Sequence, residues 1–500
     1  MSNKTKETRK IKKTDYPPTD YKRIFHPKAI AILGVSADEN GVGFGTGMLR
    51  AIMAMGYEGT IYPVNPKGGT IYGLEIHQRV EDIPGPVDFA VIAVNARYVP
   101  ESLEACLKIG VAGVEILSSG FSELGTEDGK ELERQIKKIA AKGIRVIGPN
   151  CFGIYCPKSG LTLLPGQNFS RKGGSVAFLS QSGGLANDFA HMGKWMGIYF
   201  SKVISFGNGA DLREVELIHY LANDKETRVI TMYIEGIIDG DAFFREIKAA
   251  ASKKPVIVYK GGLSLAGQRT VASHTASMGG SRTIWQSVLK QVNAIEVHNS
   301  KELAHASLAF SLLPERSFRS ISLIGGGGAL GVAACDMAED FGIEIPPLAN
   351  ELQARISDLL PRPGSSAINP IDVANPFVPP SILKEVFLLA ASDKHVELQL
   401  IVVLIPHFKP IAQMFNKTVA EVMPYRELAE VVRGVVDETG KPIIAILPNI
   451  KREVEDMDIT ETIALARKQF IDRGIPVFDE LHDAIRAISH INNYYGGKIK

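Results

Sequence analysis

The chain has 500 residues, a length that predicts two to five domains. Hydrophobic residues make up 45% of it and charged residues 22%, which is typical of globular proteins with sizeable cores. Lys and Arg total 56 and Asp and Glu total 55, so the net charge of +1 argues against nucleic acid or an anionic membrane as a partner.

Apolar stretches and cysteines narrow the class of protein further. The longest apolar stretches, such as residues 398–405, are far shorter than the ~20 residues of a membrane span. No apolar signal segment opens the sequence. The four cysteines are too few for a disulfide framework, and no Cys/His cluster has zinc-ligand spacing. We therefore expect a cytoplasmic protein without a metal site of its own.

Residues 1–20 are rich in Lys and Arg and poor in apolar side chains. Such a segment cannot bury enough surface to order itself. Glu7 and Asp15 argue against a transit peptide, which is poor in acidic residues. We predict a disordered basic tail.

Three segments then repeat one order: a short apolar run, a glycine-rich loop and a helical pattern. The apolar runs are residues 29–34, 174–179 and 321–324. They begin about 145 residues apart, which is close to one domain each. The predicted domains are residues 21–156, 173–313 and 319–500, with linkers at residues 157–172 and 313–319.

Within each domain, short runs rich in Val and Ile alternate with helical stretches. This alternation is typical of parallel strands with helices on both faces of the sheet. We predict the α/β class, with three successive Rossmann-like or flavodoxin-like domains built on parallel sheets. Ligands of such sheets bind beyond the carboxyl ends of the strands. The other predicted strands are residues 60–64, 89–94, 114–117, 145–147, 203–206, 229–234, 255–259, 399–405, 442–447 and 475–478.

The first glycine-rich loop suits a phosphate group, because backbone N–H groups and a helix N-terminus meet there. Its glycines lack the GxGxxG spacing of dinucleotide sites. The second strand ends in Asn65-Pro66-Lys67-Gly68-Gly69, and a lysine there favours a phosphorylated ribose over a free ribose hydroxyl. NADP and coenzyme A both carry a phosphorylated ribose, so both remain open, as does a merely solvated Lys67.

A site for ATP is not apparent. The segment 434–441 resembles a P-loop, but five residues instead of four separate its glycines, and Pro442 replaces the required Ser or Thr. We expect the chain to lack an ATP-binding domain of its own.

One of the 11 histidines, His274, has surroundings that suggest chemistry. It lies among small residues in the segment 267–280, which we expect to form a loop. A histidine that accepts a phosphoryl group needs one free ring nitrogen and an acceptor for the other. Glu235, at the end of the strand 229–234, is a candidate acceptor. The turn Ser180-Gln181-Ser182-Gly183-Gly184 opens a helix whose N-terminus suits the phosphate.

Together these motifs resemble the alpha subunit of NDP-forming acyl-CoA synthetases, the superfamily that includes succinyl-CoA synthetase. The resemblance covers nearly everything after the basic tail. It implies a first domain that binds coenzyme A, a second with a phosphohistidine and a further flavodoxin-like domain. The motifs are Gly34-Val35-Ser36, Asn65-Pro66-Lys67-Gly68-Gly69, Gly148-Pro149-Asn150-Cys151, Ser180-Gln181-Ser182-Gly183-Gly184, Tyr233-Ile234-Glu235-Gly236 and Ser273-His274-Thr275.

The resemblance implies roles for single residues. His274 would be the catalytic histidine that is phosphorylated, and Glu235 the carboxylate that orients it. For Cys151, a packing role remains equally open. The implied phosphate-binding residues are Ser180, Gln181, Ser182, Gly183, Gly184 and Ser273. The implied coenzyme A contacts are Gly34, Ser36, Lys67, Asn95, Ser118, Ser119, Asn150 and Cys151.

The resemblance also implies a reversible reaction in three steps. Phosphate attacks an acyl-CoA to give acyl phosphate and free coenzyme A, His274 takes the phosphoryl group and releases the acid, and the phosphohistidine phosphorylates ADP. A separate ATP-grasp beta subunit would bind ADP or ATP with its Mg. Residues 183–188 lack the aromatic residue expected of succinate-specific relatives, so the acid remains open.

Two alternatives remain. An NADP-dependent oxidoreductase would explain Lys67 but would leave His274, Glu235 and the third domain without a role. A non-catalytic regulatory protein that binds coenzyme A would keep the fold, but a retained His274 with Glu235 argues against a degenerate site.

Overall fold

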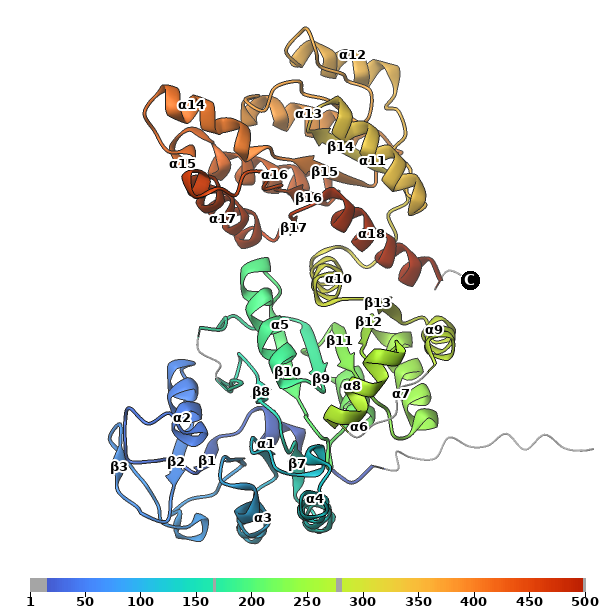
Figure 1. The fold of residues 1–500 in the computed structure, drawn as a ribbon. Coiled ribbons are helices and arrows are strands. Elements are labelled where there is room, and N and C mark those ends of the chain that lie inside the picture. The colour runs from blue at the N-terminus through green and yellow to red at the C-terminus, as the bar shows by residue number, and fades with distance from the viewer. Residues whose placement is uncertain (1–15, 165–167, 276–280, 498–500) are drawn as a thin grey trace, which may run out of the picture.

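The computed structural model describes residues 16–164, 168–275 and 281–497, with only the backbone described at residues 272–275 (Figure 1). Most of the predicted tail lies outside these residues. Residues 16–20 pack on the protein: the Tyr16 hydroxyl donates to Glu246 at 3.2 Å, and Asp20 caps helix α1 (Tyr21–Phe25). In the described part of the chain, no helix is long and apolar enough to cross a membrane.

The first sheet has five parallel strands in the order β2-β1-β5-β6-β7. Four of the five are buried along their whole length, because helices cover both faces of the sheet. The strands are β1 (Ala29–Leu33), β2 (Thr60–Val64), β5 (Phe89–Ile92), β6 (Gly113–Ile116) and β7 (Arg145–Ile147). The helices are α2 (Phe44–Ala54), α3 (Val99–Lys108) and α4 (Glu127–Ala140), and a hairpin joins β3 (Thr70–Ile71) to β4 (Leu74–Glu75).

The second sheet has six strands in the order β13-β12-β11-β9-β10-β8. Its strands are parallel except β8, which pairs with β10 in the antiparallel sense and has no counterpart among the predicted strands. The strands are β8 (Gly153–Tyr155), β9 (Val176–Ser180), β10 (Phe200–Ser205), β11 (Val229–Ile234), β12 (Val256–Lys260) and β13 (Ile295–Val297). The helices are α5 (Gly183–Met196), α6 (Glu214–Asn223), α7 (Gly240–Lys253), α8 (Leu265–Thr275), α9 (Arg282–Gln291) and α10 (Ser300–Leu312).

The third sheet has four parallel strands in the order β14-β15-β16-β17. They are β14 (Ile321–Gly325), β15 (Leu398–Val402), β16 (Ile443–Ile446) and β17 (Val477–Phe478). The helices are α11 (Gly328–Asp340), α12 (Asn350–Leu359), α13 (Pro380–Ser392), α14 (Lys409–Met414), α15 (Val419–Val422), α16 (Tyr425–Thr439), α17 (Met457–Asp472) and α18 (Leu481–Gly496).

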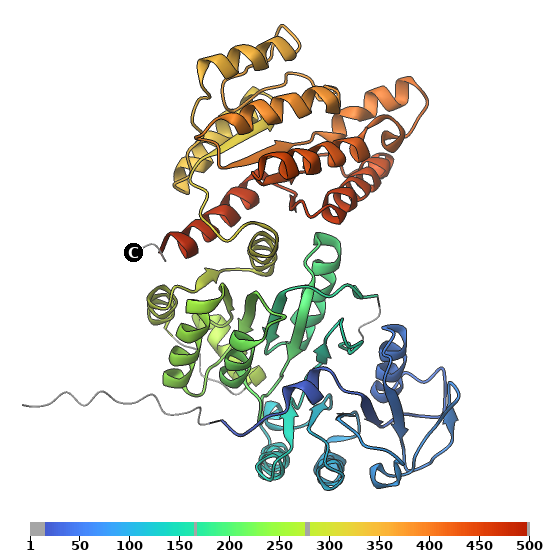
Figure 2. The same cartoon turned by 180° about the vertical axis from the view of Figure 1, so that it is seen from behind.

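The predicted fold class is confirmed: α/β units built on mostly parallel sheets follow one another along the chain (Figures 1 and 2). One local prediction is wrong. The expected loop over residues 267–280 begins as helix α8, which continues to Thr275. The Ser264 hydroxyl accepts a hydrogen bond from the Gly267 N–H at 3.0 Å, and Ala266 and Ala272 favour helix.

Buried ion pairs join the three units. Arg145 of β7 pairs with Asp211 at 2.9 Å and with Glu216 of α6 at 2.7 Å. Helices α10 and α18, which lie side by side between the second and third sheets in Figure 1, are linked by His490 and Glu302 at 3.0 Å. These contacts hold the sheets at defined positions relative to one another.

Candidate active site

The carboxyl ends of β9, β11 and β12 meet at one edge of the second sheet. Tyr233 of β11 lies opposite Ser180 of β9, and Ile234 lies opposite Lys260 of β12. The loop at Ser180 and the residue Glu235 therefore lie on neighbouring strand ends, as the parallel pattern predicts.

The Gln181 side chain builds the turn that carries Glu235. Its Oε1 accepts hydrogen bonds from the Glu235 N–H and from the Gly236 N–H, the latter at 2.9 Å, and its Nε2 donates to the Gly236 carbonyl at 3.1 Å. The side chain is buried. The side-chain amide of Gln181, predicted to bind phosphate, is thus occupied by the protein itself.

The two carboxylate oxygens of Glu235 differ in their hydrogen bonds to the described residues. The Tyr233 hydroxyl donates to Oε1 at 3.1 Å. Oε2 is buried and has no hydrogen-bond partner among the described residues. A buried carboxylate oxygen without a donor is costly, so this atom is suited to accept an N–H from a further group.

Helix α5 starts directly beside this carboxylate turn. Ser182 is its N-cap, and the Ser182 hydroxyl accepts from the Leu185 N–H at 3.3 Å. The buried Ser180 hydroxyl donates to the Ser182 carbonyl at 2.7 Å. At Gly183 an added Cβ would lie 2.8 Å from the Phe152 ring, so the helix start needs glycine there. The first N–H groups of a helix have no intrahelical partner and form an anion site.

His274 and Ser273 lie at the end of α8, and their side chains are outside the described part of the structure. The helix starts five residues after β12 and contacts the short helix η3 (Ser122–Leu124) of the first unit. Since η3 follows Ser118 and Ser119 closely in the chain, α8 links the second sheet to the predicted coenzyme A site.

The first sheet places two glycines at the turn from β1 to α2. Gly34 has a φ of +95°, and a Cβ there would overlap the Ala93 carbonyl. A Cβ at Gly45 would overlap the Gly34 carbonyl. The N-cap of α2, Gly43, makes no side-chain cap, and an added Cβ there would meet open space, so no side chain of the N-cap residue satisfies the first N–H groups of α2. This cradle fits a phosphate group of a bound cofactor.

The other predicted coenzyme A residues follow the carboxyl ends of the same sheet. Ser36 follows β1, and its hydroxyl accepts from the Asp38 N–H at 3.2 Å. Lys67 is exposed in the turn after β2, and Asn95 caps the short helix η2 (Ala96–Tyr98) after β5. Ser118 and Ser119 follow β6. Ser118 is buried and donates to the Val94 carbonyl, whereas Ser119 is exposed.

Cys151 is buried, and its Sγ donates to the Ile116 carbonyl at 3.3 Å. Burial raises the pKa of this thiol well above its ordinary value. A protonated, buried thiol favours packing over chemistry. Asn150, beside it, has a φ of +56°, and its side chain donates to Asn208 at 3.3 Å.

Glu115 and Lys260 are buried ionisable residues that none of the predicted motifs includes. Glu115 lies within β6, where burial raises its pKa to about 8. Lys260 ends β12 and is buried beside Glu235. In the sequence, both residues are marked in the same way: each is an ionisable residue inside or at the end of an apolar run of strand-forming residues.

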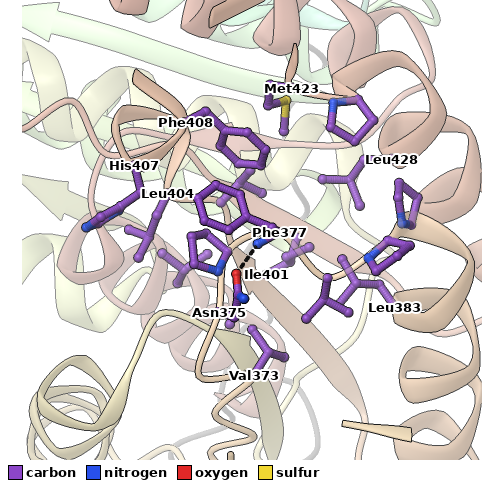
Figure 3. Close-up of a pocket in the computed structure, with 18 of the residues that line it drawn as sticks. Val373, Asn375, Phe377, Leu383, Ile401, Leu404, His407, Phe408, Met423 and Leu428 are labelled. Atoms are coloured by element: carbon purple, nitrogen blue, oxygen red, sulfur yellow. Dashed lines mark hydrogen bonds between the residues drawn. The ribbon is translucent and has the colours of Figure 1, made fainter. Parts of the chain in front are cut away.

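A separate cavity of about 520 Å³ lies at the carboxyl ends of β14 and β15 (Figure 3). The edge of the Phe408 ring meets the Phe377 ring, with centroids 4.9 Å apart, and Asn375 Oδ1 accepts from the Phe377 N–H at 2.8 Å. The lining of this cavity is mainly apolar and includes Val373, Leu383, Ile401, Leu404, Met423 and Leu428. No motif from the sequence pointed to it.

Two protein-family models match the chain: a CoA binding domain over residues 28–157 and a succinyl-CoA ligase like flavodoxin domain over residues 173–310. The fold and the order of these two domains define an acyl-CoA synthetase of the succinyl-CoA ligase class. The solved structure of an acetyl-coenzyme A synthetase 1 from Ca. Korarchaeum cryptofilum, in complex with phosphate and ADP, matches with a TM-score of 0.79 and 29% identity. That match covers 96% of this chain and 98% of that one.

The alpha subunit of the ADP-forming acetate–CoA ligase I of Pyrococcus furiosus is 35% identical, over 95% of this chain and 98% of that one. The ADP-forming acetate–CoA ligase I of Archaeoglobus fulgidus is 33% identical over 94% of this chain, but only 63% of its own length is matched. This chain belongs to the alpha subunits of the ADP-forming acyl-CoA synthetases, which are acid–thiol ligases. The predicted family is confirmed, and neither alternative is supported.

Proposed function

We propose that this chain holds coenzyme A on its first sheet and carries a phosphoryl group on His274 of its second. The observation that carries the proposal is the buried Oε2 atom of Glu235, which lacks a donor among the described residues beside the N-terminus of α5. A ring N–H of His274 is the donor that the family resemblance implies. Bound there, it leaves the other ring nitrogen free as a nucleophile.

Each proposed step exchanges one bond for another. A phosphate oxygen attacks the carbonyl carbon of the acyl-CoA, and the C–S bond breaks to release the coenzyme A thiolate. A ring nitrogen of His274 attacks phosphorus in the acyl phosphate, and the P–O bond breaks to release the carboxylate. An oxygen of ADP then attacks phosphorus, and the P–N bond breaks. The N–H groups at the start of α5 stabilise the phosphate charge in the first two steps.

The coenzyme A site consists of the cradle at Gly34 with the residues that follow β1, β2, β5 and β6. We assign Ser36, Lys67, Asn95 and Ser119 to contacts with the cofactor, because they lie on the same sheet edge. The buried Ser118 and Cys151 shape the wall of this site. The contact between α8 and η3 supports transfer between the two sites.

A beta subunit of the ATP-grasp type would bind ADP or ATP with its Mg. The support is that a Pyrococcus relative named an alpha subunit is matched over 98% of its length, whereas the Archaeoglobus relative extends well beyond the match. The four cysteines, all free thiols, suit the cytoplasm.

The test is incorporation of ³²P-phosphate into the purified chain in the presence of a panel of acyl-CoAs. We expect an acid-labile, base-stable label that His274→Ala abolishes. His191→Ala, which removes an exposed histidine of α5, is the matched control and should keep the label. The proposal fails if the wild type stays unlabelled both with acyl-CoA and phosphate and with ATP plus the beta subunit.

A further inference from the structure

Lys260 is a buried cation at the candidate active site that the proposed steps do not use. It ends β12 and pairs in register with Ile234, the residue before Glu235. Its side chain is buried, with 7% of its surface exposed. Its Cα therefore stands at the carboxyl end of β12, the edge at which ligands of parallel sheets bind.

The ammonium group holds the backbone of the site. Its Nζ donates to the Glu235 carbonyl at 2.7 Å and to the Gly261 carbonyl. It lies 5.8 Å from the centre of the Trp285 ring of α9. The backbone of Glu235 is thus held on both sides of its Cα: its carbonyl accepts from Lys260, and its N–H donates to Gln181 Oε1.

The charge of Lys260 is not neutralised by direct contact. Lys202, also buried in the second sheet, has Asp224 and Glu226 each at 2.9 Å. Lys260 forms no salt bridge with any described residue, although buried cations are normally paired. Burial lowers the pKa of the Lys260 ammonium, and the negative charge of Glu235 opposes this shift. The two opposite charges therefore attract each other across the site without contact.

We propose that Lys260 is a positioning residue of this reaction: it holds the Glu235 backbone in place and supplies a buried positive charge beside the phosphoryl group. The inference rests on the proposed function. A phosphoryl dianion is attracted by a nearby cation, and removing a cation favours the protonated forms of the acid–base groups around it. Without Lys260, the site would hold the phosphoryl charge without this cation, and the Glu235 carbonyl would lose the hydrogen bond from Nζ.

Other titratable groups also face this position. Tyr233 of β11 donates to Glu235, and burial with the Glu235 charge raises the pKa of this tyrosine. Tyr259 of β12 packs against Tyr233, with ring centroids 5.0 Å apart. The proposed function adds His274 of α8 to these groups. Lys260 is the cation of this set, so its removal is expected to move the acid limb of the pH profile.

The experiment measures the rate of ³²P incorporation from phosphate and acyl-CoA, between pH 5 and 9, in the full chain. We expect Lys260→Met to slow labelling at pH 7 by about 10-fold and to move the acid limb upward by about one pH unit. Lys260→Arg keeps the charge and should restore the position of the limb. Lys254→Met is the matched control, because Lys254 also donates to two carbonyls, at the opposite end of β12.

Two results separate this inference from the proposed function. An unlabelled wild type overturns the proposed function and this inference with it. A labelled wild type whose acid limb stays in place in Lys260→Met overturns the inference alone, whatever the loss of rate. If Lys260→Met does not fold, Lys260→Gln is measured by the same criterion, and an unmoved limb in that variant has the same meaning. Melting curves identify loss of folding, and equal losses in Lys260→Met and Lys254→Met with unchanged profiles indicate a purely structural lysine.

Discussion

Replacing Glu115 by glutamine is expected to stabilise the protein at neutral and alkaline pH. Glu115 lies in β6, between β5 and β7 of the first sheet, with 2% of its surface exposed, and accepts a hydrogen bond from the Ile154 N–H at 3.0 Å. Burial raises its pKa from 4.5 to about 8. The carboxyl group is therefore protonated in the folded protein at pH 7 and ionised in the unfolded chain.

The sign and size of the effect follow from this difference in pKa. Between pH 4.5 and 8 the unfolded chain binds fewer protons than the folded protein, so stability falls as pH rises. At pH 7 an unfolded-state pKa near 4.5 corresponds to a penalty of roughly 3 kcal/mol, at about 1.4 kcal/mol for each pH unit. The substituted glutamine would keep the acceptor for Ile154 without this penalty, but its new N–H₂ group needs an acceptor. We expect a net gain of about 1–3 kcal/mol at pH 7.

Thermal unfolding of the wild type and of Glu115→Gln at a series of pH values from 5 to 9 measures this. The difference in melting temperature should widen as pH rises and should level off above pH 8. Glu101→Gln, on the exposed face of α3, is the control and should show no such trend. A Glu115→Gln variant that is less stable than the wild type at pH 8 would refute the reasoning.

Two further predictions concern the first and third units. Gly34→Ala places a Cβ against a carbonyl at a φ of +95°, so we expect a loss of about 2 kcal/mol or more and weaker coenzyme A binding, measured by melting and calorimetry. Gly43→Ala, with open space around it, should melt as the wild type does, and equal behaviour of the two variants would contradict the clash. Asp483 is paired with Lys301 at 2.7 Å, and its pKa is far below the ordinary value because His305 and Lys301 stabilise its charge. Its contribution is present above about pH 4 and is lost as pH falls further, so Asp483→Asn should lower stability at pH 7 by about 1–3 kcal/mol and weaken acid unfolding below pH 4. An unchanged acid-unfolding curve would exclude this role.

Local sequence pattern was sufficient for most strands. Residues 60–64, 145–147 and 229–234 have the predicted bounds, because each is a short run rich in β-branched or aromatic residues between turn residues. The parallel order followed from the alternation of strands and helices. The meeting of Glu235 with the turn at Ser180 followed in turn from that order, since parallel neighbours end at the same edge.

Other features were beyond local pattern. Strand β8 has only three residues and pairs with a strand about 50 residues later in the chain, so nothing nearby marks it. Helix α8 differs from the predicted loop because small residues suit both conformations, and the hydrogen bond to the Ser264 hydroxyl favours the helix. His490 pairs with Glu302, 188 residues away, although it had no partner in the sequence.

The fold class, the family and the strand ends that carry the site could all be predicted from the sequence, because the spacing of apolar residues and the positions of glycines are local properties of the chain. Which polar atoms are buried, and which of them have partners among the described residues, depends on the tertiary structure. The Oε2 atom of Glu235 and the ammonium group of Lys260, which lack a hydrogen-bond donor and a salt bridge respectively within the described part of the chain, and the protonated Glu115 all result from neighbours that are distant in the chain. Burial and pairing depend on these long-range contacts, and no local pattern of residue types records them.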